Sequence, residues 1–451
     1  MVDYEKLLGT VDKHRENILA AERYIWKHPE TGYREWKTSA YLETEFKKLG
    51  YVLTKARNIP GFYTTIDTGR PGPCVLIMGE LDSLICADHP EADPETKAVH
   101  ACGHNAQCAA LLGIAVALKE DGALNGLSGS IKLCAVPAEE LIETGYRETL
   151  RQAGTIQYYG GKVEFLYRGY FDDVDMAFMF HTSAGKHLFS AKRGTNGCVV
   201  KNINFKGVAS HAGGSPHAGI NALYAANLGM QAINSLRETF QDNDHIRVHP
   251  IITKGGEAVS AIPSDVTIES YVRGANLDVI TEVNKRVNRA LASSATAMGA
   301  NVILSDRPGY APLINDKNLL QIAESAMKMI APAEEVSITD NWGTGCTDMG
   351  DISAVMPAIH PYAGGAVGTG HGNNYYIEDP EKACVNSAKC QLIMLYMLLS
   401  DNARKAKKVI AEKDVRYLSK QAYFEAIDAI TQDKKAVIYN EDGTVLLDYT
   451  K

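Results

Sequence analysis

Three short apolar segments, each followed by ionisable residues, restrict the fold of this chain more than any other feature. Residues 74–78 precede Glu80 and Asp82, residues 131–136 precede Glu139 and Glu140, and residues 176–180 precede His181. Continuous apolar runs of this length are typical of strands that are buried on both faces of a parallel sheet. Helical patterns lie between them, so we predict an α/β fold with right-handed crossover connections.

The polar residues that follow these strands indicate where a site would lie. Ligands of open α/β sheets bind beyond the carboxyl ends of the strands. A Glu-Glu pair alone is usually a solvated turn, and a single histidine after a strand is usually a satisfied core residue. Several ionisable groups at successive strand ends are harder to explain in this way, because burying them unpaired is costly. A metal site or an acid–base site at this edge is therefore favoured.

The segment His-Ala-Cys-Gly-His-Asn at residues 100–105 lies in sequence between the first two of these strands. Residues 106–118 follow it as an apolar run rich in small side chains, which predicts a buried helix. A thiol and imidazoles at the start of a helix commonly bind a transition metal. The alternative is a thiol and two core histidines without a ligand, and the short motif alone does not separate the two.

The pattern changes near residue 195 and predicts a second domain. Strand patterns at 199–205, 246–253, 266–272 and 301–304 and helical patterns at 219–240 and 277–298 follow one another in the order β-α-β-β-α-β. This is the order of a ferredoxin-like sandwich, and roughly 110 residues is a normal domain size. We therefore predict that residues 193–304 form an inserted α+β domain between two parts of a first domain, 1–192 and 305–451. Its open sheet edge and apolar helices could support dimerisation.

The second part of the first domain contributes one further candidate residue. His371 stands in the glycine-rich loop 364–373, where backbone can approach a site closely. The alternative is an ordinary loop histidine. Beyond about residue 404 a lysine-rich extension follows, with a hairpin expected at 440–443.

Five side chains are of the types that bind zinc-like metals. Three or four of them would serve one metal with an open position, and all five, with a bridging thiolate or water, would suit two. Glu139 is then left beside a ligand, where a carboxylate can move the proton of a metal-activated water. The five residues are Cys102, His104, Glu140, His181 and His371.

Two residues of the inserted domain could assist the hydrolysis of an amide. His211, in a small-residue loop, is a candidate donor to the tetrahedral oxyanion. Arg273, at the end of a strand, could bind a substrate carboxylate through two hydrogen bonds. The alternatives are a surface histidine and a surface arginine.

Composition argues against several classes of partner. The net charge is -8 and no basic block is present, which argues against nucleic acid. Residues 1–16 lack the apolar core of a signal peptide, and no apolar run approaches the length that crosses a bilayer. Nine cysteines without regular spacing suggest a reducing compartment, so a cytoplasmic location is expected.

With these residues assembled, the chain resembles the aminoacylase / auxin-conjugate amidohydrolase / glutamate-carboxypeptidase superfamily of metallopeptidases over about residues 5–400. Residues 102–105, 171–175 and 347–351 look most like the aminobenzoyl-glutamate hydrolase B-subunit type and the β-alanyl-lysine dipeptidase-like proteins. The motifs that carry the resemblance are His28-Pro29-Glu30, Glu80-Leu81-Asp82, residues 100–105, Pro137-Ala138-Glu139-Glu140, His181, residues 207–211, residues 219–222, Gly255-Gly256, Ile262-Pro263, Arg273 and His371.

The resemblance implies a catalytic domain with a mixed, largely parallel sheet sandwiched by helices, which is split by a ferredoxin-like lid and dimerisation domain. It implies two divalent transition-metal ions per subunit, zinc or manganese with cobalt as a further option, and Glu139 as the base. His211 would complete the partner subunit's site, and Arg273 would hold the carboxylate of the substrate. The implied metal ligands are Cys102, His104, Glu140, His181 and His371.

The chain departs from the family pattern at several positions. Ser260 stands where the family usually has an asparagine that helps to position substrate, so Ser260 is a candidate substrate-binding residue. Asn105 stands where many relatives have aspartate, and Thr182 stands where proline is common after the histidine. The segment 142–159 is longer than expected after the Glu pair and could reshape the pocket.

Three functions are compatible with these features. The favoured one is a metal-dependent amidohydrolase that cleaves the amide bond of N-acyl amino acids of the aminobenzoyl-glutamate type. The second is a dipeptidase of the same fold that acts on short unusual dipeptides. The third is a non-catalytic partner subunit, against which the presence of Glu139 and all five ligands argues. The expected macromolecular partner is a second copy in a homodimer, or a related subunit in a hetero-oligomer.

Overall fold

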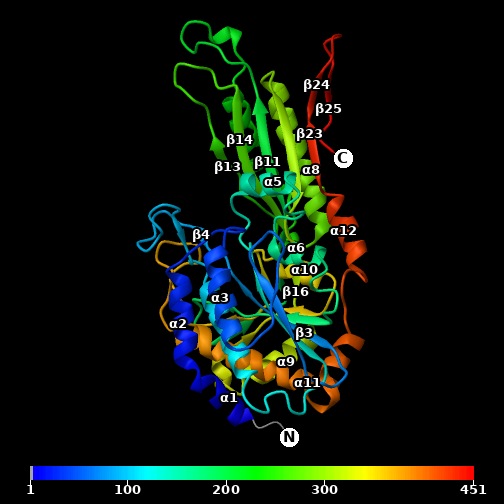
Figure 1. The fold of residues 1–451 in the computed structure, drawn as a ribbon. Helices are drawn as coiled ribbons and strands as arrows, with labels where there is room; N and C mark the ends of the chain where they lie inside the picture. Colours follow the sequence, from blue (N-terminus) through cyan, green and yellow to red (C-terminus); the bar gives the residue numbers. More distant parts are fainter. Residues whose placement is uncertain (1–3, 451) are drawn as a thin grey trace. The chain divides into compact units, whose positions relative to one another are not determined.

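The computed structural model describes residues 4–450, which form two compact units (Figure 1). The first unit comprises residues 4–194, Ile314–Trp342 and Asp351–Leu418. The second unit comprises Thr195–Leu313, Gly343–Gly350 and residues 419–450. The chain passes between the units at five places. Three lie within the short strands β10 (Gly194–Thr195), β16 (Leu313–Ile314) and β18 (Trp342–Gly343), one lies within α10 (Met349–Ser353), and one lies between Leu418 and Ser419.

The first unit is built around a six-stranded sheet in the order β1-β2-β6-β3-β7-β19. Strands β6, β3, β7 and β19 run parallel, whereas β2 pairs antiparallel with both β1 and β6. All seven residues of β3 are buried, as expected for a central strand covered on both faces. The fold is therefore the predicted mixed α/β class. The strands are β1 (Thr54–Lys55), β2 (Phe62–Asp67), β3 (Cys74–Glu80), β6 (Ser130–Val136), β7 (Met176–Phe178) and β19 (Ala358–Ile359).

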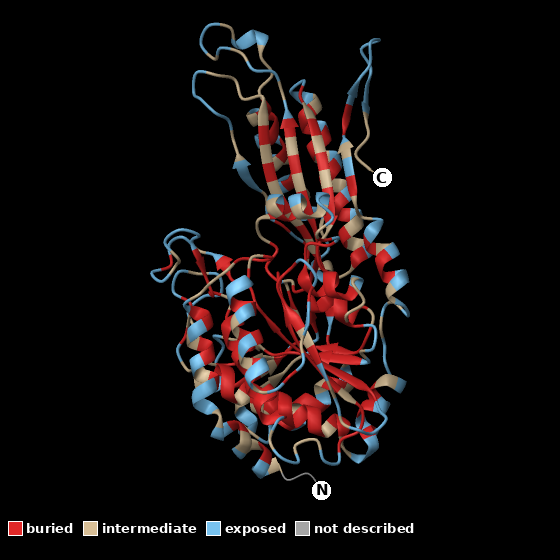
Figure 2. Cartoon of the chain, viewed as in Figure 1, coloured by how far each residue is buried: buried red, intermediate tan, exposed pale blue. Residues whose placement is uncertain are grey.

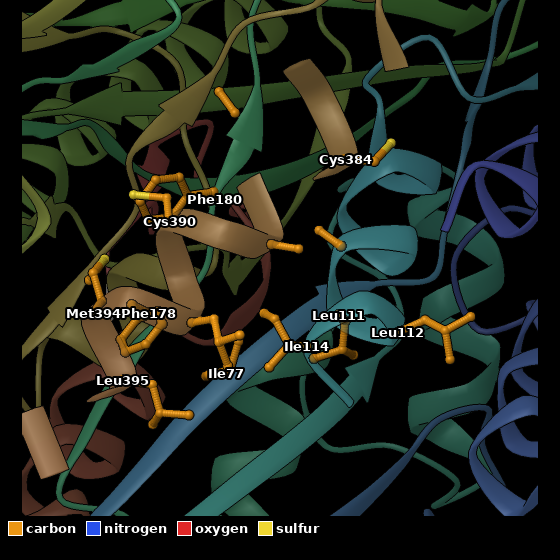
Figure 3. Close-up of a cluster of buried hydrophobic side chains, with 14 of the residues drawn as sticks. Ile77, Leu111, Leu112, Ile114, Phe178, Phe180, Cys384, Cys390, Met394 and Leu395 are labelled. Atoms are coloured by element: carbon orange, nitrogen blue, oxygen red, sulfur yellow. The ribbon is translucent and has the colours of Figure 1, made fainter. Parts of the chain in front are cut away.

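Helices cover this sheet and form the core with it (Figure 2). Helix α4 is buried at all 14 of its residues because it packs on β3, α2 and α11 at once. Figure 3 shows Ile77 of β3, Leu111 and Ile114 of α4 and Leu395 of α11 in one apolar cluster. The helices are α1 (Tyr4–Lys13), α2 (Arg15–Trp26), α3 (Trp36–Lys48), α4 (His104–Ala117), α5 (Thr144–Gln152), α6 (Gly161–Tyr167), α9 (Lys317–Met327), α10 (Met349–Ser353) and α11 (Ser387–Ala411).

A second, four-stranded sheet lies in the same unit, in the order β17-β9-β20-β8. Its register places Tyr362 directly beside His181 on the neighbouring parallel strand. Its strands are β8 (His181–Thr182), β9 (Phe189–Ala191), β17 (Val336–Ile338) and β20 (Tyr362–Ala363), and the remaining pairs of this unit are β4 (Leu84–Ile85) with β5 (Ala98–Val99) and β21 (Ala366–Val367) with β22 (Tyr376–Ile377).

One helical segment in the described chain, Glu381–Ala411, is long and apolar enough to cross a membrane by length and composition. The prediction that no apolar run approaches that length was therefore too strong. However, 78% of its most apolar window is buried inside the protein. A core helix passes the same test, and here the apolar side chains pack against α4 and α9.

The second unit has the predicted β-α-β-β-α-β order, with helices α7 (Ala222–Leu236) and α8 (Leu277–Ala297) packed on an antiparallel sheet. Alternate residues of β14 are buried against these helices. The sheet has the order β12-β14-β11-β15-β23, and β13 also pairs with β14. Its strands are β11 (Gly197–Lys206), β12 (Arg247–Val248), β13 (Ile251–Lys254), β14 (Asp265–Gly274), β15 (Asn301–Pro308) and β23 (Gln432–Lys435).

The C-terminal extension belongs to the second unit, although the sequence placed it with the catalytic domain. Its helix α12 (Lys420–Asp428) leads into β23, which pairs antiparallel with β15 and covers that edge of the sheet. The predicted hairpin follows as β24 (Val437–Tyr439) and β25 (Val445–Leu447). Pairing between β15 and β23 joins positions more than a hundred residues apart, which no local pattern signals.

Buried polar side chains connect the extension to the interior of the second unit. Lys201 on β11 lies 2.5 Å from Asp306 on β15, and both are completely buried. Asn284 and Asn288 of α8 hydrogen-bond both residues. Gln432 of β23 donates a further hydrogen bond to Asp306. The network is thus completed by a residue of the extension.

The helical pattern of residues 4–27 predicts one helix and the apolar run 354–359 predicts one strand, and both predictions were wrong. Residues 4–27 do not form one helix, because His14 adopts a non-helical conformation between α1 and α2. Residues 354–359 do not form one strand, because the chain turns after α10 and only β19 is extended.

Candidate metal centre

The metal-ligand motif sits at the start of α4, and Gly103 fixes its geometry. Gly103 caps the helix with φ +86, a left-handed conformation that favours glycine. A side chain there would also collide with Thr182 and the Tyr375 hydroxyl. Cys102 therefore lies just outside the helix and His104 is its first residue.

Cys102 lies at the centre of the candidate ligands. Its sulfur is 3.3 Å from Nε2 of His181, the first residue of β8. The ligand atoms of Cys102, His104 and His181 all lie within 4.8 Å of one another, and so do those of Cys102, Glu140 and His371. Two sets that share one thiol are the arrangement expected for two metal positions joined by a bridging thiolate.

His371 reaches this cluster from the glycine-rich loop. Its φ of +64 is left-handed, and its backbone N–H donates to the carbonyl of Ala101 at 2.8 Å. Its Nε2 lies 3.2 Å from Oε1 of Glu140. The loop is therefore anchored to the segment that carries Cys102.

Hydrogen bonds at Nδ1 orient the imidazoles of His104 and His181. Nδ1 of His104 lies 2.9 Å from the carbonyl oxygen of Asp82 and 3.2 Å from its carboxylate. Nδ1 of His181 lies 2.8 Å from the carbonyl of Thr182. Each Nδ1 is thus the donor, and each Nε2 is turned toward the other candidate ligands, as in metal-binding histidines.

Two buried ligand atoms form no well-aligned hydrogen bond among residues 4–450, although each lies within 3.2 Å of a charged side chain, Glu80 or His371. They are Nε2 of His104 and Oε1 of Glu140. Orphaned buried polar atoms are uncommon and costly. Both atoms belong to the ligand sets and are of the types that zinc or manganese accepts. The residues present therefore fit a pair of divalent transition metals.

Charges within the cluster shift its pKa values. Burial and Glu140 act to raise the pKa of Cys102, but the imidazoles of His181 and His104 outweigh them and lower it to about 6. Burial likewise opposes ionisation of Glu140, yet His371 and His104 lower the pKa of that carboxyl to about 2. The Glu140 carboxylate in turn raises the pKa of His371.

Glu139 stands beside this cluster at the end of β6. It is 7% exposed, and its carboxylate lies 3.9 Å from Nε2 of His104. The turn before it is held by Glu35, whose carboxylate accepts a hydrogen bond from the backbone N–H of Ala138 at 2.8 Å. Ala138 has a φ of +58, so this strand end is a fixed bend that presents two successive carboxylates.

A buried ion pair next to His104 was not anticipated from the sequence. Lys162 of α6 lies 2.5 Å from Oε1 of Glu80, and both side chains are fully buried. The other oxygen of Glu80 accepts a hydrogen bond from Gln107 and lies 3.1 Å from Nε2 of His104. Lys162 opposes the effect of burial and keeps the pKa of Glu80 low. The longer segment noted after the Glu pair is therefore the part of the chain that leads to this lysine.

Two departures from the family pattern also lie near the cluster. Asn105 is buried and donates a hydrogen bond to Glu22 at 2.7 Å, so it contacts α2 instead of the candidate ligands. The Thr182 hydroxyl lies 2.7 Å from the Tyr375 hydroxyl and donates to the carbonyl of Cys102. Thr182 thus stabilises the loop that carries Cys102.

The remaining predicted site residues lie in the second unit. His211 is exposed, and its Nδ1 accepts hydrogen bonds from the backbone of Gly213 and Gly214. Ser260 is exposed, and its carbonyl accepts from Ala212. Arg273 is partly buried near the end of β14 and forms no ion pair with a carboxylate of residues 4–450. The first unit alone thus brings together the five candidate ligands and Glu139.

Thiolate, imidazole and carboxylate ligands beside an additional buried carboxylate are characteristic of a metal-dependent hydrolase. The chain belongs to the peptidase family M20/M25/M40, whose family model matches residues 76–395. It is thus a hydrolase of the class that acts on amide bonds.

The sequence identity to individual relatives is below 30%. The chain is 28% identical to an Xaa-Arg dipeptidase of Mus musculus, over 78% of this chain and 77% of that protein. It is 27% identical to the B-subunit of p-aminobenzoyl-glutamate hydrolase from Escherichia coli, over 65% of this chain and 58% of that protein. A solved dinuclear metal-binding M20 peptidase from Bacillus subtilis matches with a TM-score of 0.63 and 18% identity, over 86% of this chain and 99% of that one. At that identity the structural match shows the fold alone.

Proposed function

We propose that this protein cleaves the amide bond of N-acyl amino acids of the aminobenzoyl-glutamate type. The observation that carries the proposal is the position of Glu139, a buried carboxylate 3.9 Å from a candidate ligand atom but outside the two ligand sets that share Cys102. The relationship to p-aminobenzoyl-glutamate hydrolase supports the substrate class. The relationship to Xaa-Arg dipeptidase supports a dipeptidase activity as the second candidate.

The proposed ligands are the five residues gathered around the Cys102 thiol: Cys102, His104, Glu140, His181 and His371. Two divalent ions, zinc or manganese with cobalt as a further option, fit this set because it combines soft and borderline ligands. When bound, such ions lower the pKa of a water molecule and stabilise developing negative charge.

Glu139 acts as the base and then as the acid. Its carboxylate accepts a proton from the attacking water as the oxygen–carbon bond forms. It then returns that proton to the leaving nitrogen as the carbon–nitrogen bond breaks. The products are the free acid and the free amine, so atoms and charges balance with one water consumed.

The second unit is the proposed lid, at residues 193–304, with the C-terminal strand added to its sheet. Arg273 is the proposed anchor for the substrate carboxylate, because its guanidinium has no carboxylate partner among the described residues. His211 is the proposed oxyanion donor for the site of a partner subunit, and Ser260 is proposed to contact substrate. Exposure of His211 and Ser260 supports both roles.

The proposed assembly is a homodimer formed through the lid. Tyr224 and Leu228 of α7 are 63% and 39% exposed, and Ile251 of the adjoining edge strand β13 is 51% exposed. Exposed apolar residues on one helix and a neighbouring strand edge are typical of an interface. A hetero-oligomer with a related subunit is the alternative, since one relative is named as a subunit of a hydrolase. A cytoplasmic location remains the expectation.

Turnover of pooled substrates tests the function. Protein loaded with zinc or manganese is incubated with N-acyl amino acids and dipeptides, and depletion is followed by mass spectrometry beside a Glu139→Gln control. Loss of N-acyl amino acids with the native protein alone supports the proposal. Loss of dipeptides alone supports the second candidate. No loss of either class, with metal bound and the fold intact, contradicts both and favours a non-catalytic subunit.

A further inference from the structure

Two of the nine cysteines contact each other outside the metal centre. Cys198 lies on β11, and Cys346 lies in the glycine-rich loop Gly343–Gly350 of the same unit. Their thiols are hydrogen-bonded to each other. The sulfur of Cys346 also lies 3.5 Å from the carbonyl oxygen of Gly197, the residue before Cys198. All nine cysteines are in the described chain, and all are thiols.

The guanidinium of Arg273 faces this pair of cysteines. Cys198 and Arg273 are direct cross-strand partners of β11 and β14, so their side chains lie on the same face of the sheet. The guanidinium interacts with both sulfur atoms. The hydrogen bond from Cys346 lowers the pKa of Cys198, burial opposes this, and Arg273 lowers it further. A nearby cation favours the thiolate, which is the reactive form.

We propose that Cys198 and Cys346 form a reversible disulfide that controls the surroundings of Arg273. The oxidant is a hydroperoxide, taken here as hydrogen peroxide. One thiolate attacks the O–O bond to give a sulfenic acid, and the displaced hydroxide takes up a proton to become water. The second thiolate attacks that sulfur, the S–S bond forms, and a second water leaves. Two thiols and one peroxide thus give one disulfide and two waters.

The difference in burial between the two cysteines indicates which thiol reacts with the peroxide and which one completes the disulfide. Cys346 is partly exposed, so peroxide reaches it first, whereas Cys198 is 2% exposed and acts as the resolving thiol. The loop has room to adjust, because a side chain at the preceding Gly345 would meet nothing within 4 Å. Cys198 is fixed by close packing against Gly309, where no side chain would fit. The disulfide therefore forms by movement of the loop toward the strand.

The consequence for activity rests on the proposed function. Oxidation removes the two ionisable thiols that face Arg273 and ties the loop to β11 beside the guanidinium. Since Arg273 is the proposed anchor for the substrate carboxylate, we expect a several-fold change in KM with little change in kcat.

Peptide mapping of the metal-loaded protein tests the pair directly. After treatment with hydrogen peroxide, non-reducing digestion should yield one linked peptide joining Cys198 and Cys346, and dithiothreitol should separate it. The matched control is Cys346→Ser, which should give no linked peptide containing Cys198. No link between these two residues, or a link to another cysteine, would overturn the proposal.

Kinetics then test the connection with Arg273. A mapped disulfide with unchanged KM would show that the pair does not act on substrate binding, and that part of the proposal would be wrong. Because mapping needs no substrate, failure of the proposed amidohydrolase activity and failure of the disulfide are separate results.

Discussion

Glu80 and Lys162 form an ion pair from which solvent is fully excluded, with 2.5 Å between the carboxylate and the ammonium group. The pair lies beside His104, since the second oxygen of Glu80 is 3.1 Å from Nε2, the candidate ligand atom of that histidine. A buried ion pair adds little net stability, but removing one partner leaves an uncompensated charge. Lys162 therefore supports the metal centre through Glu80.

Replacement of Lys162 by methionine should destabilise the first unit by about 3–5 kcal/mol, because Glu80 is left buried without its ammonium partner. Urea unfolding followed by tryptophan fluorescence measures the change. The double variant Lys162→Met/Glu80→Gln should recover much of the loss, since both charges are removed together. Equal destabilisation in the single and double variants would show that the loss comes from packing and not from charge.

The variants Glu139→Gln and Glu140→Gln should lose activity for different reasons. The first removes the base and should lower kcat by a factor of about 10²–10⁴ while metal content stays at the native level. The second removes a ligand and should lower metal content as well. Elemental analysis of both variants beside their turnover separates the two roles. Metal loss in Glu139→Gln would instead make that residue a ligand.

Cys102 should react with iodoacetamide in the chelator-treated protein along a curve with its midpoint near pH 6, its lowered pKa. The thiolate is the reactive form, so labelling is fast above this pH and falls about tenfold for each unit below it. Bound zinc should block the reaction. Mass spectrometry of the labelled peptide gives the rate, with Cys102→Ser as the control for other thiols. A midpoint above pH 8 would contradict the influence of the two imidazoles.

The Lys201–Asp306 pair should make the second unit sensitive to acid. Burial opposes ionisation of Asp306, but Lys201 and the asparagines outweigh it and lower the pKa of this carboxyl. A depressed carboxyl pKa contributes stability that is fully present above the unfolded value of about 3.9 and is lost as the pH falls through the folded value. The protection factors of peptides from α8 and β15, which correct for the slower intrinsic exchange in acid, should therefore fall below about pH 4.

The double variant Lys201→Met/Asp306→Asn is the matched comparison for that experiment, because it removes both charges together. Its exchange should depend less on pH in the same range. If both proteins lose protection in parallel, the acid sensitivity arises elsewhere in the unit.

Features that depend on local pattern could be predicted from the sequence. The runs that became β3 and β6 are largely apolar, with Lys132 as the charged exception in β6, and their ends carry the carboxylates that the structure places at the candidate metal centre. The β-α-β-β-α-β order of the second unit followed from periodicity alone. The thiol and imidazole of residues 102 and 104 could be recognised because they are close in sequence and precede an apolar helix.

Features that depend on pairing between distant residues could not be predicted. Lys162 and Glu80 are 82 residues apart, and Gln432 and Asp306 are 126 apart. Strand β23 has the sequence Gln-Asp-Lys-Lys, which reads as a polar tail. It becomes a strand because β15 offers an unpaired row of backbone groups. Burial of Lys162 and the strand character of β23 both arise from tertiary contacts.

The covered edge at β15 also limits the symmetry of any assembly built through this sheet. A sheet with two open edges can add copies at both sides and grow into a fibre. Here β23 is itself the outer strand on one side, and its Gln-Asp-Lys-Lys sequence carries charges that discourage strand pairing, so we expect copies to pair at the side of β13. Two copies that meet there use the same edge and leave none for a third. Any association through this sheet is therefore expected to be closed and two-fold.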